Sequence, residues 1–154
     1  MTGSGASIGG GVRSLACGYV ATVGGGFINT ASGNYSFVGG GQANYASGNS
    51  STIAGGYVNF ATGDYSFVGG GETNTASGTY SVIGGGYSNV SSYNQTTVGG
   101  GNTNLACGDI ATVAGGRQNC ATNTKSAVLG GRLNTASGYY SVIGGGKQNT
   151  ADAN

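Results

Sequence analysis

The stretch VGGGETNTASGTYSVIGGG, residues 68–86, begins and ends on the same glycine triplet, and the two triplets lie fifteen residues apart. The same interval recurs from Gly9 to Gly144 without insertion or deletion. Counted from the first residue of each triplet, the repeat reads G-G-G-x-x-N-x-A-S-G-x-Y-S-x-V, and ten repeats begin within the chain. A fixed period of this length indicates a repeat architecture. Three repeats replace the first glycine, at Ala54, Ala114 and Leu129.

A unit of fifteen residues is too short for a pair of helices and fits one coil of a β-solenoid, with two short strands and two turns. Position 15 is Val or Ile in every complete repeat, position 13 is small, and position 8 is Ala in nine of ten repeats. Uniform size predicts that these three positions face the interior, so strand alternation turns positions 12 and 14 outward. We therefore expect an all-β fold, a parallel β-roll or β-solenoid of ten 15-residue coils. It forms one repeat domain over residues 1–154, without caps or linkers.

The remaining repeated positions fit the turns of such a coil. Glycine reaches φ > 0 without steric cost, which predicts sharp turns at the triplet and at the glycine of position 10. Asn occupies position 6 in nine of ten repeats, and stacked coils should align its amides into a ladder. Proline is absent, as expected if each backbone N–H bonds to a neighbouring coil.

Composition argues against several functions. The chain has five basic and four acidic residues, a net charge of +1 and no membrane-length apolar run, so we expect neither nucleic-acid binding nor membrane insertion. There is no histidine to activate a serine, and the carboxylates are scattered over different coils. We expect no enzymatic activity, no cofactor and no metal site; an ice-binding face is a distant alternative. The carboxylates are Asp64, Glu72, Asp109 and Asp152.

The three cysteines are best read as free thiols. Cys17 and Cys107 share position 9 but lie six coils apart, roughly 29 Å at ordinary strand spacing, which is too far for a disulfide. Cys107 and Cys120 lie on adjacent coils but are offset by two positions, so that a bond would need distortion. An odd number of cysteines also leaves a bond between chains open.

The outward positions 12 and 14 carry large apolar side chains in several repeats. A long apolar stripe is unfavourable in water, which predicts a subunit interface. A strip of aromatic rings for stacking sugars is the alternative. The candidate interface residues are Tyr35, Phe37, Tyr65, Phe67, Tyr80, Val82, Ile110, Tyr140 and Val142.

A second candidate surface lies at position 4. Arg117, Arg132 and Lys147 occupy this position on three consecutive coils, where like charges repel unless something offsets them. They form either a solvated edge or a contact for a polyanion or acidic glycan. Earlier repeats place Phe27, Tyr57 and Tyr87 at the same position on alternate coils, as a sugar-stacking row or simply as exposed rings.

The phrase NTASG-x-YS-x-VGGG resembles the YadA-like head repeats of trimeric autotransporter adhesins, and similar repeats in phage and large-virus fibre proteins. The resemblance covers nearly the whole chain. It implies a left-handed parallel β-roll, three chains packed side by side as a homotrimer, and attachment to a host cell or matrix. It also implies an extracellular location, on a cell or virion surface.

These observations lead to one expected function and one alternative. We expect a structural and adhesive module, the head or shaft of a surface adhesin or viral fibre, with a host-surface glycan or protein as its partner. The alternative is a subunit of an extracellular filament. In that case uncapped coils stack end to end, because an open end of the roll is an exposed sheet edge.

Overall fold

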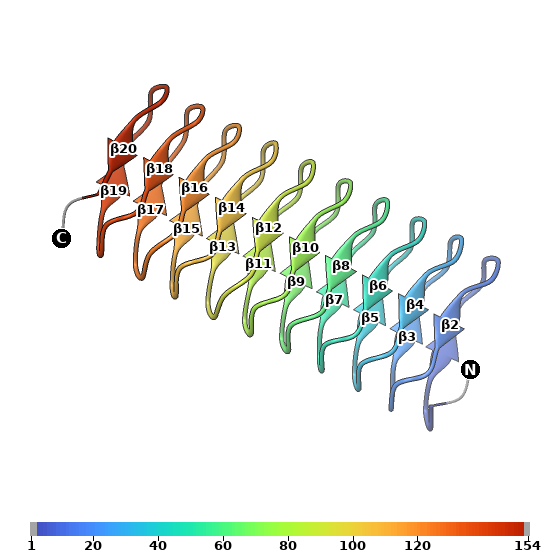
Figure 1. Cartoon of the computed structure of the whole chain (residues 1–154). Helices are drawn as coiled ribbons and strands as arrows, with labels where there is room; N and C mark the ends of the chain where they lie inside the picture. Colours follow the sequence, from blue (N-terminus) through green and yellow to red (C-terminus); the bar gives the residue numbers. More distant parts are fainter. Residues whose placement is uncertain (1–2, 153–154) are drawn as a thin grey trace.

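A computed structural model describes residues 3–152, and over these residues the chain is an all-β solenoid without helices. Two strands of two residues each belong to every coil, and they build two parallel sheets of ten strands. The coils follow one another in a single row, with the chain ends at opposite ends of the row (Figure 1). The prediction of a parallel β-solenoid of about ten coils is confirmed. The expected domain limits, residues 1 and 154, lie outside the described part.

The odd-numbered strands occupy positions 14 and 15 of the repeat. They are β1 (Ser7–Ile8), β3 (Thr22–Val23), β5 (Phe37–Val38), β7 (Thr52–Ile53), β9 (Phe67–Val68), β11 (Val82–Ile83), β13 (Thr97–Val98), β15 (Thr112–Val113), β17 (Ala127–Val128) and β19 (Val142–Ile143).

The even-numbered strands occupy positions 7 and 8. They are β2 (Leu15–Ala16), β4 (Thr30–Ala31), β6 (Tyr45–Ala46), β8 (Phe60–Ala61), β10 (Thr75–Ala76), β12 (Val90–Ser91), β14 (Leu105–Ala106), β16 (Cys120–Ala121), β18 (Thr135–Ala136) and β20 (Thr150–Ala151).

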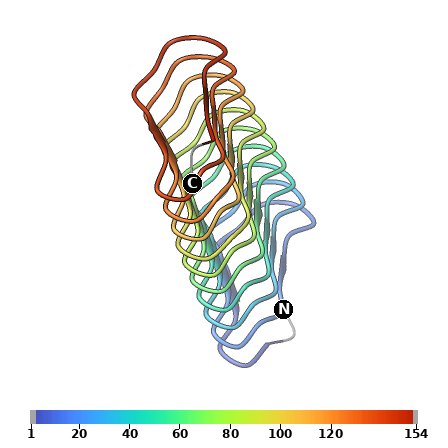
Figure 2. The ribbon, with the colours of Figure 1, turned by 60° about the vertical axis from the view of Figure 1, so that its left-hand side comes forward.

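Within each sheet, a strand residue pairs with the residue fifteen positions further along the chain. Val82 pairs with Thr97 in this way, and Thr75 pairs with Val90. A third ladder of single parallel bridges joins the position-4 residues, from Val12 to Lys147. Most N–H groups therefore point along the long axis of the rod toward the next coil. The flattened coils stack in this register along the whole rod (Figure 2).

The interior is a thin column of small and β-branched side chains. Val or Ile of position 15 and Ala of position 8 are buried in nearly every coil, and the side chains of position 13 lie beside them. The placement of positions 8, 13 and 15 inside the coil is therefore confirmed. Each coil buries so little apolar surface that the hydrogen-bonded ladders carry much of the cohesion.

The asparagines of position 6 are also buried and form the expected amide ladder. The Nδ2 of Asn44 donates to the carbonyl oxygens of Gly40 (3.0 Å) and Gly56 (2.9 Å). Its Oδ1 accepts the backbone N–H of Asn59 at 3.0 Å. The same pattern recurs from Asn29 to Asn134, so one amide ties two glycine turns and the next coil together. The ladder is confirmed, and it lies inside the coil.

The glycine prediction is right for the first turn and wrong for the second. Gly41, at position 3, has φ = +87°, and a Cβ there would collide with Gly56 of the next coil. None of the glycines of position 10, all of which are described, has a positive φ. They are needed for space, since a Cβ on Gly33 would collide with the carbonyl of Gly48. The left-handed residue of the second turn is at position 12, such as Tyr35 with φ = +57°.

Candidate binding surfaces

The aromatic face consists of the outward side chains at positions 12 and 14. Tyr65 and Tyr80 stack with their ring centroids 4.9 Å apart and their planes within 8°. Phe67, on β9, is 38% exposed and Val142, on β19, is 60% exposed. All nine candidate interface residues lie on this face and all but the half-buried Val82 are exposed. The register places position 14 of every coil above position 14 of the coil before, as Val82 lies above Phe67. Position 12 lies in the turn that precedes this strand, where the stacked rings of Tyr65 and Tyr80 show the same alignment.

The aromatic face ends in a polar contact near the last coils. The Nζ of Lys125 lies 2.7 Å from the hydroxyl oxygen of Tyr140 and 4.7 Å from the centroid of its ring. The hydrogen bond from Lys125 lowers the pKa of Tyr140, and the same bond raises the pKa of Lys125. A hydrogen bond to Tyr140 raises the pKa of Tyr139. These groups are exposed, so the effects change titration more than stability.

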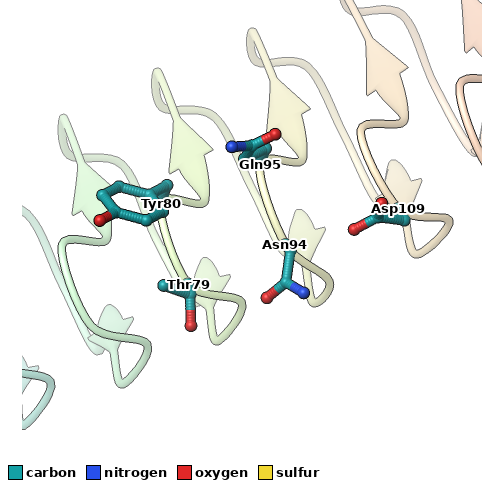
Figure 3. Close-up of a pocket in the computed structure, with 5 residues that line it drawn as sticks. All are labelled: Thr79, Tyr80, Asn94, Gln95 and Asp109. Carbon is teal, nitrogen blue, oxygen red and sulfur yellow. The ribbon is translucent and has the colours of Figure 1, made fainter.

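A shallow depression of about 420 Å³ interrupts the aromatic face. It is lined by residues of positions 11 and 12 on three consecutive coils (Figure 3). Gln95 stands at position 12 between Tyr80 and Ile110, where it breaks the sequence of large apolar side chains. Asp109 supplies the only carboxylate of the five lining residues, so the depression has hydrogen-bonding groups but no acid–base pair. These residues are Thr79, Tyr80, Asn94, Gln95 and Asp109.

The position-4 row is the second predicted surface, and the structure places its members side by side. Each residue bridges to the next across one coil spacing, including Arg117 to Arg132 and Arg132 to Lys147. All ten residues of the row are exposed. The row is Val12, Phe27, Gln42, Tyr57, Glu72, Tyr87, Asn102, Arg117, Arg132 and Lys147.

A third surface, the position-7 row, was not singled out from the sequence. It is the outward face of the even-numbered sheet, and it carries Tyr45 and Phe60 with ring centroids 6.5 Å apart. The signal was present, because a residue next to the invariably small position 8 must point outward in a strand. The row mixes apolar residues with threonine: Leu15, Thr30, Tyr45, Phe60, Thr75, Val90, Leu105, Cys120, Thr135 and Thr150.

The cysteines form no disulfide. Cys17, Cys107 and Cys120 are free and half-buried. Burial raises the pKa of the Cys107 thiol, and burial together with the nearby Cys107 raises the pKa of the Cys120 thiol. Both thiols therefore stay protonated at neutral pH and are weak nucleophiles.

Within residues 3–152, no three His, Cys, Asp or Glu side chains come together as a group able to hold a metal ion. The same residues include no helix with the length and apolar character needed to cross a membrane. No protein-family model matches the chain, and neither does any curated protein. The resemblance to YadA-like repeats thus stands on the residues quoted for it and stays a prediction.

Proposed function

We propose that this chain is a structural and adhesive module, a trimeric β-roll head or shaft of a surface adhesin or viral fibre. The observation that carries the proposal is the aromatic face. Exposed apolar side chains occupy position 12 or 14 in six of the nine coils from Val20 to Val142, and so much exposed apolar surface on one rod is unfavourable in water. Covering it with equivalent faces of other copies removes that surface from water.

The shape of the coil supports packing of chains side by side. Each coil buries only one Val or Ile, one Ala and one small residue, which is little apolar surface for the fifteen residues that must be ordered. The backbone ladders stabilise the coil, and a second apolar layer between chains would stabilise it further. The resemblance to head repeats favours three chains and a left-handed roll. The position-4 row and the position-7 row would then remain exposed on the trimer and bind a host-surface glycan or protein.

The test is the mass of the protein in solution, measured by sedimentation over a concentration series. We expect a fixed mass of three chains. We expect Phe67→Asp, on the aromatic face, to dissociate the trimer, because it places a charge in a dry interface. Phe60→Asp, on the position-7 row, is the matched control and should leave the trimer intact.

Other results would change the proposal in defined ways. A mass that grows without limit as concentration rises would support the end-to-end filament, since all coils share one register. A stable monomer would overturn the interface, and the aromatic face would then become the leading site for a ligand. Dissociation by Phe60→Asp alone would show that the other sheet is the one that packs.

A further inference from the structure

The position-4 row combines rings, polar groups and cations on one exposed line. From Phe27 to Lys147 its members are joined coil by coil through parallel bridges, which at the usual ~4.8 Å strand spacing makes a line of roughly 40 Å. The register is a consequence of the fold, but the residue types on this line are particular to it, and they match a long partner in spacing, shape and charge.

The rings of the row repeat on alternate coils. Phe27, Tyr57 and Tyr87 are exposed, and none of them stacks on another ring of residues 3–152. Gln42 and Glu72 stand between them, with side chains able to hydrogen-bond hydroxyl groups. In an extended β-1,4-linked polysaccharide, every second sugar presents the same face. One sugar is about as long as one strand spacing, so rings two coils apart meet equivalent sugars.

The cations continue the same line. The only carboxylate of the row is Glu72, three coils before Arg117, so no acidic residue of the row lies next to Arg117, Arg132 or Lys147. Neighbouring cations about 5 Å apart repel one another by up to about 1 kcal/mol even in water. Arginine forks bind carboxylates through paired hydrogen bonds, and these long side chains reach either edge of a flat sugar chain.

The glycines beside the row leave room for a partner. A Cβ on Gly25, Gly55 or Gly115, at position 2, would meet no atom within 4 Å. Space within the chain therefore does not require glycine at these three positions, and none of the three has a positive φ, whereas the position-2 glycines Gly70, Gly85, Gly100 and Gly145 have φ between +149° and +158°. A band of bare backbone next to the row lets a flat ligand approach closely.

We propose that the position-4 row binds a linear polysaccharide with a carboxylate on each sugar, laid along the rod with one sugar per coil. Its sugars stack on Phe27, Tyr57 and Tyr87, and its carboxylates pair with Arg117, Arg132 and Lys147. This assignment rests on the adhesive part of the proposed function and names its ligand class. It does not depend on how many chains assemble.

Glu72 gives the assignment a sharp signature. It is the one carboxylate in the row, and it lies three coils from Arg117, about 14 Å away, beyond the Debye length of about 10 Å at 0.1 M salt. A carboxylated sugar passing over Glu72 meets a like charge. Removing this charge should therefore strengthen binding, whereas removing a cation should weaken it.

The experiment is calorimetric titration of the chain with decamers of β-1,4-linked polymannuronate at low salt. We expect binding that weakens as salt is added, and at least about tenfold weaker binding of neutral β-1,4-mannan decamers. The triple variant R117N/R132N/K147N should lose about tenfold or more in affinity, and Y57Q/Y87Q about threefold to tenfold. Glu72→Gln should gain about twofold to fivefold. The row itself contains Asn102 and Gln42, so these substitutions suit the coil.

Matched controls lie off the row. Lys125→Gln removes a cation at position 12, Asp109→Asn removes a carboxylate at position 11, and Tyr93→Gly removes a ring at position 10. All three should leave the affinity within about twofold of the wild type. If Lys125→Gln weakens binding as much as Arg132→Gln does, the protein responds to net charge and the row is not the site.

Two further results would overturn the proposal. If the wild-type chain does not bind polymannuronate, the proposed ligand class is wrong. If heparin fragments of equal charge bind more tightly, the row recognises sulfate groups and not carboxylates. Sedimentation of every variant separates this proposal from the proposed function. A trimer that does not bind rejects only the ligand, and a monomer that binds rejects only the assembly.

Discussion

Nineteen side chains of this protein hold a backbone conformation that most residues avoid. Positions 5 and 12 have φ between +53° and +59°, and they include β-branched residues such as Val58 and Ile110. An L-residue in this region costs about 1–2 kcal/mol. The geometry persists because it closes the ladders: the N–H of Val58 donates to the carbonyl of Gln42 in the preceding coil at 3.0 Å. Local strain is therefore offset by hydrogen bonds between coils.

The contact between Lys125 and Tyr140 gives a prediction at the same scale. Because the hydrogen bond lowers the pKa of Tyr140, we expect one tyrosine to ionise before the others in an absorbance titration of the phenolate. Lys125→Met should move this early step to higher pH, although the hydrogen bond from Tyr139 still lowers the pKa of Tyr140, and Lys147→Met, on the other surface, should leave the step unchanged. An unchanged titration curve in Lys125→Met would contradict the assignment.

The sign of the stability effect follows from the same shifts. The folded-state pKa of Tyr140 is lowered, so its contribution is present above the ordinary tyrosine value and is lost as pH falls through the lowered pKa. The folded-state pKa of Lys125 is raised, so its contribution is present below the ordinary lysine value and is lost as pH rises through the raised pKa. The contact is therefore strongest in the alkaline range between these two limits.

Among the elements of the fold, the asparagine ladder stabilises the rod from inside, because its buried amides hydrogen-bond the turns of successive coils to one another. The amide of Asn74 donates to the carbonyls of Gly70 and Gly86, and its Oδ1 accepts the N–H of Asn89 at 3.0 Å. Because Asn74 is fully buried, no water replaces these bonds when the amide is removed. One side chain thus stabilises both turns and the junction of two coils.

We expect Asn74→Ala to destabilise the rod by several kcal/mol, because each buried group left without a partner costs about 1–3 kcal/mol. Hydrogen exchange of the Asn89 amide should accelerate most, since it loses its acceptor. Thr75→Ala, at the neighbouring outward position, should change the unfolding midpoint little. Equal protection of the Asn89 amide in wild type and Asn74→Ala would contradict this role.

The same elements show what the sequence can and cannot predict. Uniform size identified the interior Val, Ile and Ala, because a closed coil tolerates no variation there. The position-10 glycines led to a wrong prediction of positive φ, since glycine occurs both where φ is positive and where two backbone segments approach closely. Only the structure shows that Gly33 is needed because the backbone of the next coil lies close to it. The position-7 row was missed for a related reason. Its position beside the small position 8 marks it as outward, but residues as different as Leu15, Phe60 and Thr75 do not share a chemical type that would mark the row as a surface.

For the whole molecule, the fixed register predicts how the chain responds to deletion. Removing residues 69–83, one repeat, joins equivalent positions and should give a shorter rod with the same fold. Removing 69–82 leaves one extra residue where Val68 joins Ile83, and this residue must bulge out of the coil and break the ladder there. Circular dichroism and limited proteolysis should show a folded, protected chain in the first case and cleavage at the altered coil in the second. Equal protection of both would contradict the register.

The direction of the ladders also decides how the rod responds to force. Hydrogen bonds join each coil to the next along the row of coils, so a pull on the two ends stretches them end-on. An outermost coil has a neighbouring coil on one side only, so it peels away first and releases fifteen residues, about 50 Å of slack. Under tension the chain therefore lengthens in steps of one coil, and the coils that remain keep their register.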